Sequence, residues 1–264
     1  MCVDPPNPKP ACSSVANHAS ALRRIHVPAP PTPGQAFALP PDAAHHLRQV
    51  LRAAVGAPLT LFTGDGREWP SNIVAIDARH VMAQAETSVA VDRESPLPIT
   101  LTQAIGKGQR MEHSIQKAVE LGVSRIVPVF TQRSVVKLDA QRRERKTEHW
   151  RAVAVAACEQ CGRNRIPEIA APEKLMRYFA TRPLQPMELG LFLDPRGDRS
   201  LTRLTRPARI RVLIGPEGGF TAEERAQAAA CGYLGLRLGA RILRTETAGP
   251  AIIAALQTLW GDFG

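Results

Sequence analysis

The sequence predicts an α/β fold in which a small barrel of short strands precedes a larger domain with a parallel sheet. From residue 96 onward, strand-like and helix-like segments alternate, which is typical of parallel strands covered by helices. From residue 21 to 95, short segments with β-branched centres are separated by Pro, Gly or Asp, which predicts a barrel. The stretch Ser95-Pro96-Leu97-Pro98 is expected to be stiff and extended, and it marks the boundary between the two domains.

The composition favours a polyanionic partner. The 264-residue chain carries a formal net charge of +10, and each cation placed on a phosphate releases condensed counterions. A solvated basic surface that serves only solubility is the alternative. No run of 18 apolar residues occurs, so no membrane span is expected. Residues 1–20 lack the continuous apolar core of a secretory signal, and we expect either a disordered tail or a misassigned start there, and a cytoplasmic protein.

In the first domain, one helix is expected among the strands. The helix is predicted from Asp42 to Arg52, with Leu47, Val50 and Leu51 on its inner side. Its arginines and histidines make it basic, and a solvated or capping role is the alternative to RNA contact for the histidines. The strands are predicted in R-R-I-H-V, L-T-L-F-T, N-I-V-A-I and V-M-A-Q-A.

In the second domain, several helix ends carry clear signals. Gly122 is expected to end one helix in a left-handed conformation, and Asp139 to cap a long helix that runs to Cys161. The first half of that helix is almost all charge, which is typical of a solvated face. Strands are expected at residues 99–105, 123–130, 189–194, 212–214 and 236–238, and a last helix at residues 248–260.

A glycine-rich turn follows the strand at residues 212–214. The apolar run stops at Gly215 and Pro216, and Thr221 with Glu224 forms a capping box that starts a helix directly afterwards. A strand, a glycine-rich turn and a helix N-terminus together bring backbone N–H groups close to a ligand. The spacing matches neither G-x-G-x-x-G nor a Walker loop. It therefore indicates either a ligand-binding turn or an ordinary α/β connection.

A polar loop lies between the next strand and the last helix. Residues 241–247 are rich in Arg, Thr and Glu, whereas a connection of roughly two to six residues usually suffices there. A polar loop of this kind faces either water or a ligand. The two loops together are therefore the candidate binding site.

The five cysteines do not indicate a disulfide framework, because their number is odd and the chain is long. Cys158 and Cys161 have C-x-x-C spacing, but no second pair accompanies them. They share a helical stripe with Trp150, Ala154 and Ala157. Buried small apolar residues are therefore favoured over a metal site, and no metal is expected.

Two motifs, I-G-P-E-G-G-F-T-A-E-E and L-G-A-R-I-L-R-T-E-T-A, resemble the 16S ribosomal RNA uridine-N3 methyltransferase family of the SPOUT superfamily. Q-K-A-V-E-L-G-V-S-R-I-V-P-V, Q-R-S-V-V-K-L and E-Q-C-G-R-N-R-I-P extend the resemblance, which runs from about Arg24 to the C-terminus. It implies a SPOUT domain at residues 96–264, with a deep trefoil knot that binds S-adenosylmethionine. It also implies a PUA-like barrel at residues 21–95 that grips rRNA, and a homodimer joined through the SPOUT domain.

The chain departs from this family at two places. Cys161 stands where the family usually has serine, and Gly249-Pro250 where it usually has alanine and another apolar residue. If Thr247 caps the last helix, Pro250 lies in the first turn, where an N–H group has no intrahelical partner. The start of this helix shapes the candidate cofactor loop.

The resemblance also suggests roles for individual residues. Arg163 and Arg244 are expected to stabilise a uracil anion, although the dipole of a helix C-terminus also explains Arg163 and Arg165. Glu246 is a candidate base that could equally cap a helix or pair with Arg244. RNA contacts are expected from Arg24, His45, Arg48, Arg52, Arg133, Lys137 and Arg165. Cofactor contacts, mostly through the backbone, are expected from Leu193, Gly215, Glu217, Gly218, Gly219, Leu238, Ile242, Leu243 and Ala248.

The expected activity is S-adenosylmethionine-dependent methylation of N3 of a specific uridine in 16S rRNA, either free or within the small ribosomal subunit. Two alternatives stay open. One is a SPOUT methyltransferase that modifies a ribose 2′-oxygen. The other is an RNA-binding or ribosome-assembly factor that has lost its cofactor pocket, against which the intact glycines at 215, 218 and 219 count.

Overall fold

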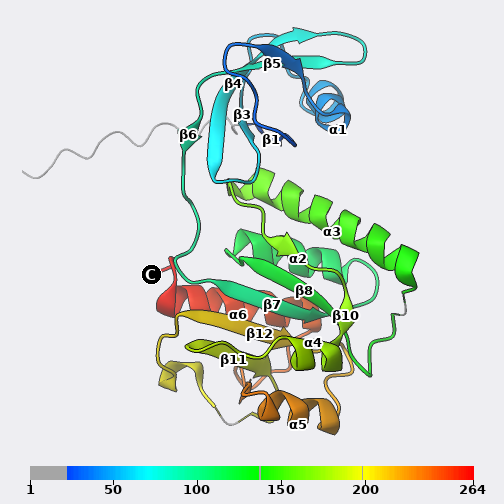
Figure 1. The fold of residues 1–264 in the computed structure, drawn as a ribbon, viewed down its shortest axis with the longest axis vertical. Helices are drawn as coiled ribbons and strands as arrows, with labels where there is room; N and C mark the ends of the chain where they lie inside the picture. The colour runs from blue at the N-terminus through cyan, green and yellow to red at the C-terminus, as the bar shows by residue number, and fades with distance from the viewer. Residues whose placement is uncertain (1–22, 137, 198) are drawn as a thin grey trace, which may run out of the picture.

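A computed structural model describes residues 23–136, 138–197 and 199–264 of the chain. Figure 1 shows two β-sheets, and the long helix α3 (Ala140–Cys161) runs from the smaller sheet along the larger one. Each sheet has its own hydrophobic core, except that Phe62 of the smaller sheet packs into the core of the larger one. The expected tail at residues 1–20 lies outside the described residues. Among the residues that the structure describes, no helix combines the length and apolar character needed to cross a membrane.

The first sheet contains the four strands predicted from sequence and two others. Its strand order is β1-β3-β4-β5-β2, in which only β1 and β3 run parallel. Leu47, Leu61 and Val81 lie in its closed core, each fully buried. The alanine-rich β2 carries little β-branched signal, which explains why it was not predicted. The strands are β1 (Arg23–His26), β2 (Ala36–Ala38), β3 (Pro58–Phe62), β4 (Arg67–Ile76), β5 (Val81–Ala85) and β6 (Val89–Ala90).

The helix of this domain differs from the prediction. It consists of α1 (Pro41–His45) followed by a π-helical turn, η1 (His46–Val50). Leu47 is fully buried as expected, but Val50 is 63% and Leu51 37% exposed, so both inward assignments were wrong. A π turn contains more residues than an α turn, so positions after Leu47 rotate away from the face that α-helical spacing predicts.

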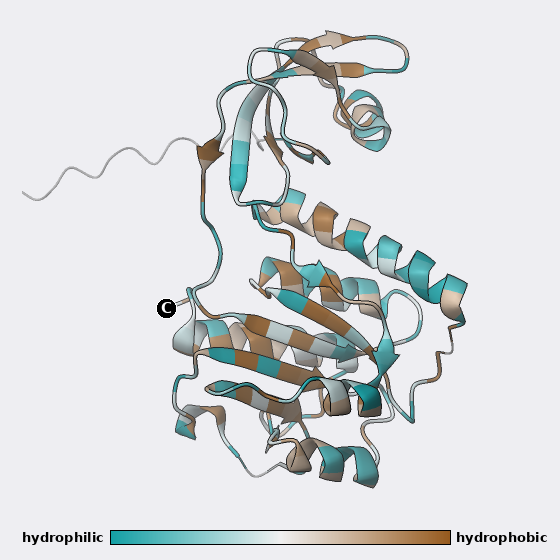
Figure 2. Cartoon of the chain, in the orientation of Figure 1, coloured by the Kyte–Doolittle hydropathy of each residue, from teal (hydrophilic) through white to brown (hydrophobic). Residues whose placement is uncertain are grey.

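The second sheet is parallel, as predicted, and has seven strands. Its order is β10-β8-β7-β12-β11-β13, with β9 also paired to β8. Helices α2, α3 and α6 pack on one face, and α4 and α5 pack on the other. Figure 2 shows apolar residues along the central strands and a hydrophilic first half of α3, as its charge predicted. The elements are β7 (Ile99–Ala104), α2 (Arg110–Glu120), β8 (Arg125–Phe130), β9 (Glu168–Ile169), β10 (Glu173–Lys174), α4 (Leu175–Thr181), β11 (Glu188–Leu193), the 3-10 turn η2 (Leu201–Arg203), β12 (Arg209–Ile214), α5 (Ala222–Ala230), β13 (Leu234–Leu236) and α6 (Thr245–Trp260).

The helix signals in this domain are confirmed. The carboxylate of Asp139 accepts a hydrogen bond from the backbone N–H of Arg142 at 2.8 Å, and Gly122 has a φ of 83°. Cys158 is fully buried and Cys161 partly so, as their apolar stripe predicted. Burial raises the pKa of the Cys158 thiol to about 12, so this side chain behaves as a small apolar group.

The connection from β11 to β12 passes around the end of β13. Leu236 pairs with Leu193 of β11, and its carbonyl accepts a hydrogen bond from the amide of Asp194. Arg199, farther along the same connection, forms a parallel bridge with Leu236. The backbone N–H and C=O groups of a strand form hydrogen bonds with neighbours on its two edges. The connection from β11 to β12 therefore lies along both edges of β13 at Leu236. This arrangement agrees with the knotted fold that the family resemblance implies.

The last helix starts earlier than expected. Arg244 is its N-cap and Thr245 its first residue, so Thr247 does not cap it and Pro250 lies in the second turn. The early start follows from the side chain of Thr245, which is fixed by hydrogen bonds to two other elements. Proline has no N–H, so the carbonyl of Glu246 lacks its usual intrahelical donor. The expected strand also ends at Leu236 and does not reach residue 238.

A buried arginine ties α3 to the segment between the two sheets. Arg163 is 4% exposed, and its Nη1 donates to the carbonyls of Val119 and Val123, both at 2.9 Å. Its Nε lies 3.1 and 3.2 Å from the carboxylate oxygens of Glu94, and Nη2 also donates to that carboxylate. These contacts occupy most of its donors. The expectation that Arg163 acts on a substrate anion is therefore corrected: this residue is part of the framework.

Arg24 also has a structural role in place of the expected RNA contact. Its side chain is 9% exposed and pairs with Glu68 at 2.9 Å. It also donates to the side chain of Asn164, which follows α3, and lies 5.0 Å from the ring centre of Phe62. Asn164 in turn donates to Glu68 at 3.1 Å. The motif at residues 159–165 therefore joins the first sheet to α3.

Loss of the Arg163 side chain should destabilise the fold. In Arg163→Met, the Glu94 carboxylate and the Val123 carbonyl lose their donors, and the Val119 carbonyl keeps only backbone donors such as Gly122 N–H, so the free energy of unfolding should fall by about 3–5 kcal/mol. Arg142→Met is the control, because that side chain is 71% exposed and its ion pair with Asp139 should contribute less than about 1 kcal/mol. Urea denaturation measures both changes. Equal stability of the two variants would contradict the framework role.

Candidate active site

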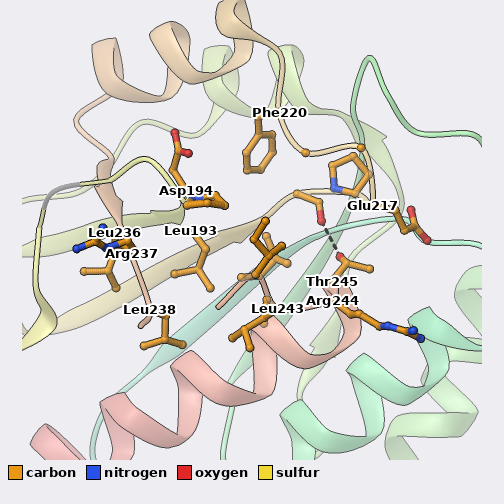
Figure 3. A pocket seen from close by; sticks show the side chains of 18 of the residues that line it. Leu193, Asp194, Glu217, Phe220, Leu236, Arg237, Leu238, Leu243, Arg244 and Thr245 are labelled. Carbon is orange, nitrogen blue, oxygen red and sulfur yellow. Dashed lines mark hydrogen bonds between the residues drawn. The ribbon is translucent and has the colours of Figure 1, made fainter. Parts of the chain in front are cut away.

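The carboxyl ends of three neighbouring strands enclose a cavity of about 580 Å³. The loops after β11, β12 and β13 contribute residues 193–196, 214–220 and 236–246 to its lining. Ligands in open parallel sheets bind beyond these strand ends, where loops diverge. Figure 3 shows Leu193, at the end of β11, and Leu238 and Leu243, from the loop after β13, gathered around this space. The cavity therefore offers apolar contact on one side and loop backbone on the other.

Both loops that sequence analysis selected meet in this cavity. Of the residues expected to act in catalysis, Arg244 and Glu246 line it and Arg163 does not. Arg133, expected to contact RNA, also lies at its rim. The nine positions expected to contact the cofactor all line it: Leu193, Gly215, Glu217, Gly218, Gly219, Leu238, Ile242, Leu243 and Ala248.

A hydrogen bond from Thr245 joins the two loops. The Thr245 hydroxyl donates to the Gly215 carbonyl at 2.6 Å, as the dashed line in Figure 3 marks. The same hydroxyl accepts a hydrogen bond at 3.1 Å from the side-chain amide of Gln103, which is 1% exposed. The start of α6 is thereby fixed to the end of β12 and to β7. Sequence analysis did not single out Thr245 or Gln103, because their partners lie far away in the chain.

Two glycines of the first loop have conformations or surroundings that a side chain would disturb. Gly219 has a φ of +67°, in the left-handed region that other residues rarely adopt. A Cβ on Gly215 would lie 3.1 Å from the ring of Phe220, closer than ordinary contact. These glycines let the backbone line the cavity directly.

The first loop is held by its flanking segments as well. The capping box predicted at Thr221 and Glu224 is present, and the Glu224 carboxylate also accepts from the backbone of Gln132 at 2.8 Å. Arg133 donates to the Gly218 carbonyl at 2.7 Å. The segment after β8 therefore packs against the glycine-rich turn, which places Arg133 beside the cavity.

Charged groups concentrate at one end of the cavity. Arg110, the first residue of α2, donates to the Glu217 carboxylate, and its Nε lies 3.8 Å from Glu246 Oε1. Partial burial tends to raise the pKa of Glu217, but hydrogen bonds from backbone N–H groups and from Arg110 outweigh it and hold that pKa below its ordinary value. Sequence analysis missed Arg110, because nothing near it in the chain marks a site.

The remaining residues expected to contact RNA lie outside the cavity. His45 and Arg52 are exposed on or beside the helix of the first domain, and Arg48 is partly exposed there. Arg165 is exposed and packs its guanidinium over Gly66, close enough that a Cβ on this glycine would lie 2.8 Å from it. Lys137 lies outside the described residues.

Comparison with known proteins identifies two matching family models. A model described as "RNA methyltransferase domain" matches residues 93–257, and one described as "RNA methyltransferase PUA domain" matches residues 39–85. The ribosomal RNA small subunit methyltransferase E of Buchnera aphidicola (Acyrthosiphon pisum strain) is 31% identical over 252 residues, which cover 95% of this chain and 99% of that protein. The protein of the same name from Bacillus subtilis is 27% identical, with 84% and 89% covered.

Two solved structures are closely similar. A Neisseria gonorrhoeae ribosomal RNA small subunit methyltransferase E bound to S-adenosyl methionine is 36% identical, with a TM-score of 0.84 and coverage of 92% of this chain and 100% of that one. A Legionella pneumophila methyltransferase in complex with the same cofactor is 40% identical, with a TM-score of 0.87 and coverage of 92% and 99%. With a PUA-like first domain and a SPOUT-like second domain, the chain belongs to the RNA methyltransferase family, in the group of the ribosomal RNA small subunit methyltransferase E proteins.

Proposed function

We propose that the protein transfers a methyl group from S-adenosylmethionine to N3 of a specific uridine in 16S rRNA. The observation that carries the proposal is the cavity built by the two loops whose motifs resemble the uridine-N3 family. When bound, the cofactor supplies a methyl group activated by a positively charged sulfonium. The chain's own residues have to hold the two reactants and handle the uracil proton.

The cavity suits the cofactor in size and lining. Its volume of about 580 Å³ lies within the roughly 300–1,000 Å³ of small-ligand sites. Leu193, Leu238 and Leu243 offer apolar contact for a flat ring, and the glycine turn leaves its backbone open to polar groups. A side chain at Gly215 would have to displace Phe220. We propose that the nine positions expected from sequence bind the cofactor here.

Two charged residues at the cavity rim suit the methyl acceptor. Methylation at N3 requires loss of the imide proton, and negative charge then spreads over the uracil carbonyl oxygens. Arg244 is exposed at the start of α6 and could offer donors to this charge. Glu246 lies two residues further along the helix, with a carboxylate oxygen that has no donor within the described residues. We propose both residues for the reaction, and we exclude Arg163 from it.

We propose that exposed cations bind the rRNA. His45, Arg48 and Arg52 of the first domain, and Arg133 and Arg165 of the second, remain accessible in the structure. The net charge of +10 supports this role, since phosphate contacts supply most of the affinity of basic proteins for RNA. Lys137 remains a prediction from the sequence.

We further propose a homodimer joined through the second domain, as the family resemblance implies. Ile252, Ile253 and Leu256 of α6 are fully buried in the chain's own core, so these residues do not argue for a partner. Leu259 and Phe263, which are 43% and 50% exposed, support it. We also propose a cytoplasmic location, and the small ribosomal subunit as the form of the substrate. A further proposal is the division into domains at residues 21–95 and 96–264, which is supported by the hydrophobic core that each sheet has.

The glycine turn at residues 215–219 can be tested by a substitution at Gly219. Gly219→Val should weaken S-adenosylhomocysteine binding at least tenfold, because a β-branched residue at a φ of +67° forces the loop out of shape. Gly56→Val is a matched control, since Gly56 has a φ of +84° and, like Gly219, would place no Cβ within 4 Å of other atoms. Isothermal titration measures affinity, and thermal melting should show similar stability losses. Equal affinities in the two variants would remove the turn from the cofactor site.

The second prediction concerns the position of the methyl group. N3 methylation blocks the base-pairing edge of uracil, so reverse transcriptase should stop at the modified nucleotide at every nucleotide concentration. A 2′-O-methyl group would stop it only when nucleotides are scarce. The reaction uses unmodified 16S rRNA or small subunits with labelled cofactor. Label that stays on the ribose after release of unmodified uracil would favour the 2′-O activity over the proposed one.

The third prediction concerns RNA affinity. Arg48→Ala and Arg52→Ala should each reduce the slope of log affinity against log salt by about 0.7–0.9, if each side chain contacts one phosphate. Arg79→Ala, on the exposed turn between β4 and β5, should leave the slope unchanged. Filter binding to a 16S rRNA fragment over a range of salt concentrations measures all three. The same slope for all variants would contradict contact by this helix.

A further inference from the structure

A second cavity, shallow and wide open to solvent and of about 530 Å³, adjoins the proposed cofactor site. Arg110 and Glu246 line both cavities, so these two side chains form a shared wall between them. The second cavity is otherwise lined by the segment before α2 and by its first turns. Its full lining is Lys107, Gly108, Gln109, Arg110, His113 and Glu246.

The topology explains why these residues meet. Strand β7 pairs directly with β12, so the segment that leaves β7 emerges beside the glycine-rich turn. Arg110 begins α2 after β7, and Glu246 lies in the first turn of α6. These two helices pack against each other on the same face of the sheet. Residues from opposite ends of the domain are thereby placed at one edge of the cofactor cavity.

Arg110 is held in place but retains free donors. Its Nη1 bonds to Glu217, and its Nε lies 3.8 Å from Glu246 Oε1, beyond hydrogen-bond distance. A guanidinium has five N–H donors, and Arg110 makes no other side-chain hydrogen bond with the described residues. Its side chain is 40% exposed. The remaining donors are therefore available to a ligand between the two carboxylates.

Glu246 has the complementary feature, a free acceptor. Its Oε2 is buried and has no hydrogen-bond partner within the described residues, although the side chain as a whole is 17% exposed. A buried carboxylate oxygen without a donor is unfavourable. A rotation of the Glu246 side chain that brings this oxygen to a ligand N–H in the cavity would satisfy it. Donors of Arg110 and an acceptor of Glu246 thus line the same small cavity beside the cofactor site.

We propose that this second cavity binds the target uracil, with Glu246 as the proton acceptor and with Arg110 stabilising the uracil anion together with Arg244. The inference rests on the proposed N3 methylation. The N3–H bond breaks and its proton moves to the Glu246 carboxylate, while Arg110 donates to a uracil carbonyl oxygen. The N3 electron pair then forms the new bond to the methyl carbon. The electron pair of the broken sulfur–carbon bond stays on sulfur, which becomes a neutral thioether.

The same pair of residues explains a preference for uracil over cytosine. The uracil edge presents an N3–H donor between two carbonyl acceptors, which matches one carboxylate flanked by guanidinium donors. Cytosine presents an unprotonated N3, whose lone pair would face the Glu246 oxygen without a hydrogen bond. Recognition and proton removal therefore depend on the same two side chains.

The test compares Glu246→Gln and Arg110→Met with a control, Lys117→Met. Lys117 lies on α2, and its side chain pairs with Glu120 alone among the residues that the structure describes. Single-turnover methylation of unmodified 16S rRNA should slow at least 100-fold in the first two variants and stay within twofold in the control, since loss of a general base costs about 10²-fold or more. Affinity for S-adenosylhomocysteine, measured by isothermal titration, should change less than threefold in Glu246→Gln and in the control. Arg110→Met also releases Glu217 in the cofactor cavity, so its methylation rate is measured at saturating cofactor.

Rescue by a more acidic substrate separates proton transfer from a structural effect. In 16S rRNA transcribed with 5-fluorouridine, N3 loses its proton more readily, so the Glu246→Gln defect relative to the unaltered enzyme should shrink at least tenfold. If the Glu246→Gln defect is the same with 5-fluorouridine as with uridine, Glu246 is not the proton acceptor. A normal methylation rate of Glu246→Gln with uridine, or an equal loss of its cofactor affinity, would overturn that role as well. A normal rate in Arg110→Met would overturn that residue's role.

The position of the methyl group in the same reactions keeps the two proposals distinct. A product methylated on ribose would overturn the proposed function itself. N3-methyluridine formed at the normal rate by both variants would overturn only the uracil site described here.

Discussion

The hydrogen bond from the Thr245 hydroxyl to the Gly215 carbonyl holds together the two loops on which the cavity depends. The hydroxyl has one proton to donate, and the amide of Gln103 occupies its acceptor side, so its direction is fixed. Because Thr245 begins α6, this contact also sets where the helix starts and which side chains its first turn presents. Arg244 and Glu246 reach the cavity rim as a consequence.

The position of Thr245 also explains how α6 accommodates Pro250. The helix begins early because its first turn is anchored to β12, and the missing N–H of the proline then falls in the second turn. Next to it, Gly249 is packed against the Gln103 side chain, where an added Cβ would lie 3.4 Å from the amide oxygen. Gly249 and Pro250, the two residues that depart from the family pattern, therefore lie within the anchored helix, after the first-turn residues that line the cavity.

Local signals in the sequence predicted much of the fold, whereas long-range electrostatic pairing could not be predicted. The Thr221–Glu224 capping box and the Asp139 cap lie within a single helical turn, so spacing alone identifies them. Arg163 meets Glu94, which is 69 positions away, and Arg110 meets Glu217, 107 positions away. The sequence does not distinguish an arginine that is buried in the framework from an arginine at the active site. The distinction depends on the carboxylate with which each arginine pairs in the folded chain.

Some of the arginines are buried and form ion pairs within the fold, whereas others remain exposed on the surface. Arg24 and Arg163 join the two sheets through Glu68, Glu94 and neighbouring groups, and they are withdrawn from solvent. The cations that remain exposed, on the first domain and beside the cavity, are the ones that we propose to bind RNA. The framework therefore fixes the orientation of a basic surface relative to the candidate active site, which suits a substrate far larger than one nucleotide.

The central claim is that this chain methylates N3 of a uridine in 16S rRNA, and mass mapping of that rRNA tests it most directly. The rRNA is taken from cells that lack the gene and from the same cells supplied with it. The account predicts a single N3-methyluridine that disappears with the gene and returns with it. An unchanged N3-methyluridine content, or a change confined to ribose methylation, would contradict the account.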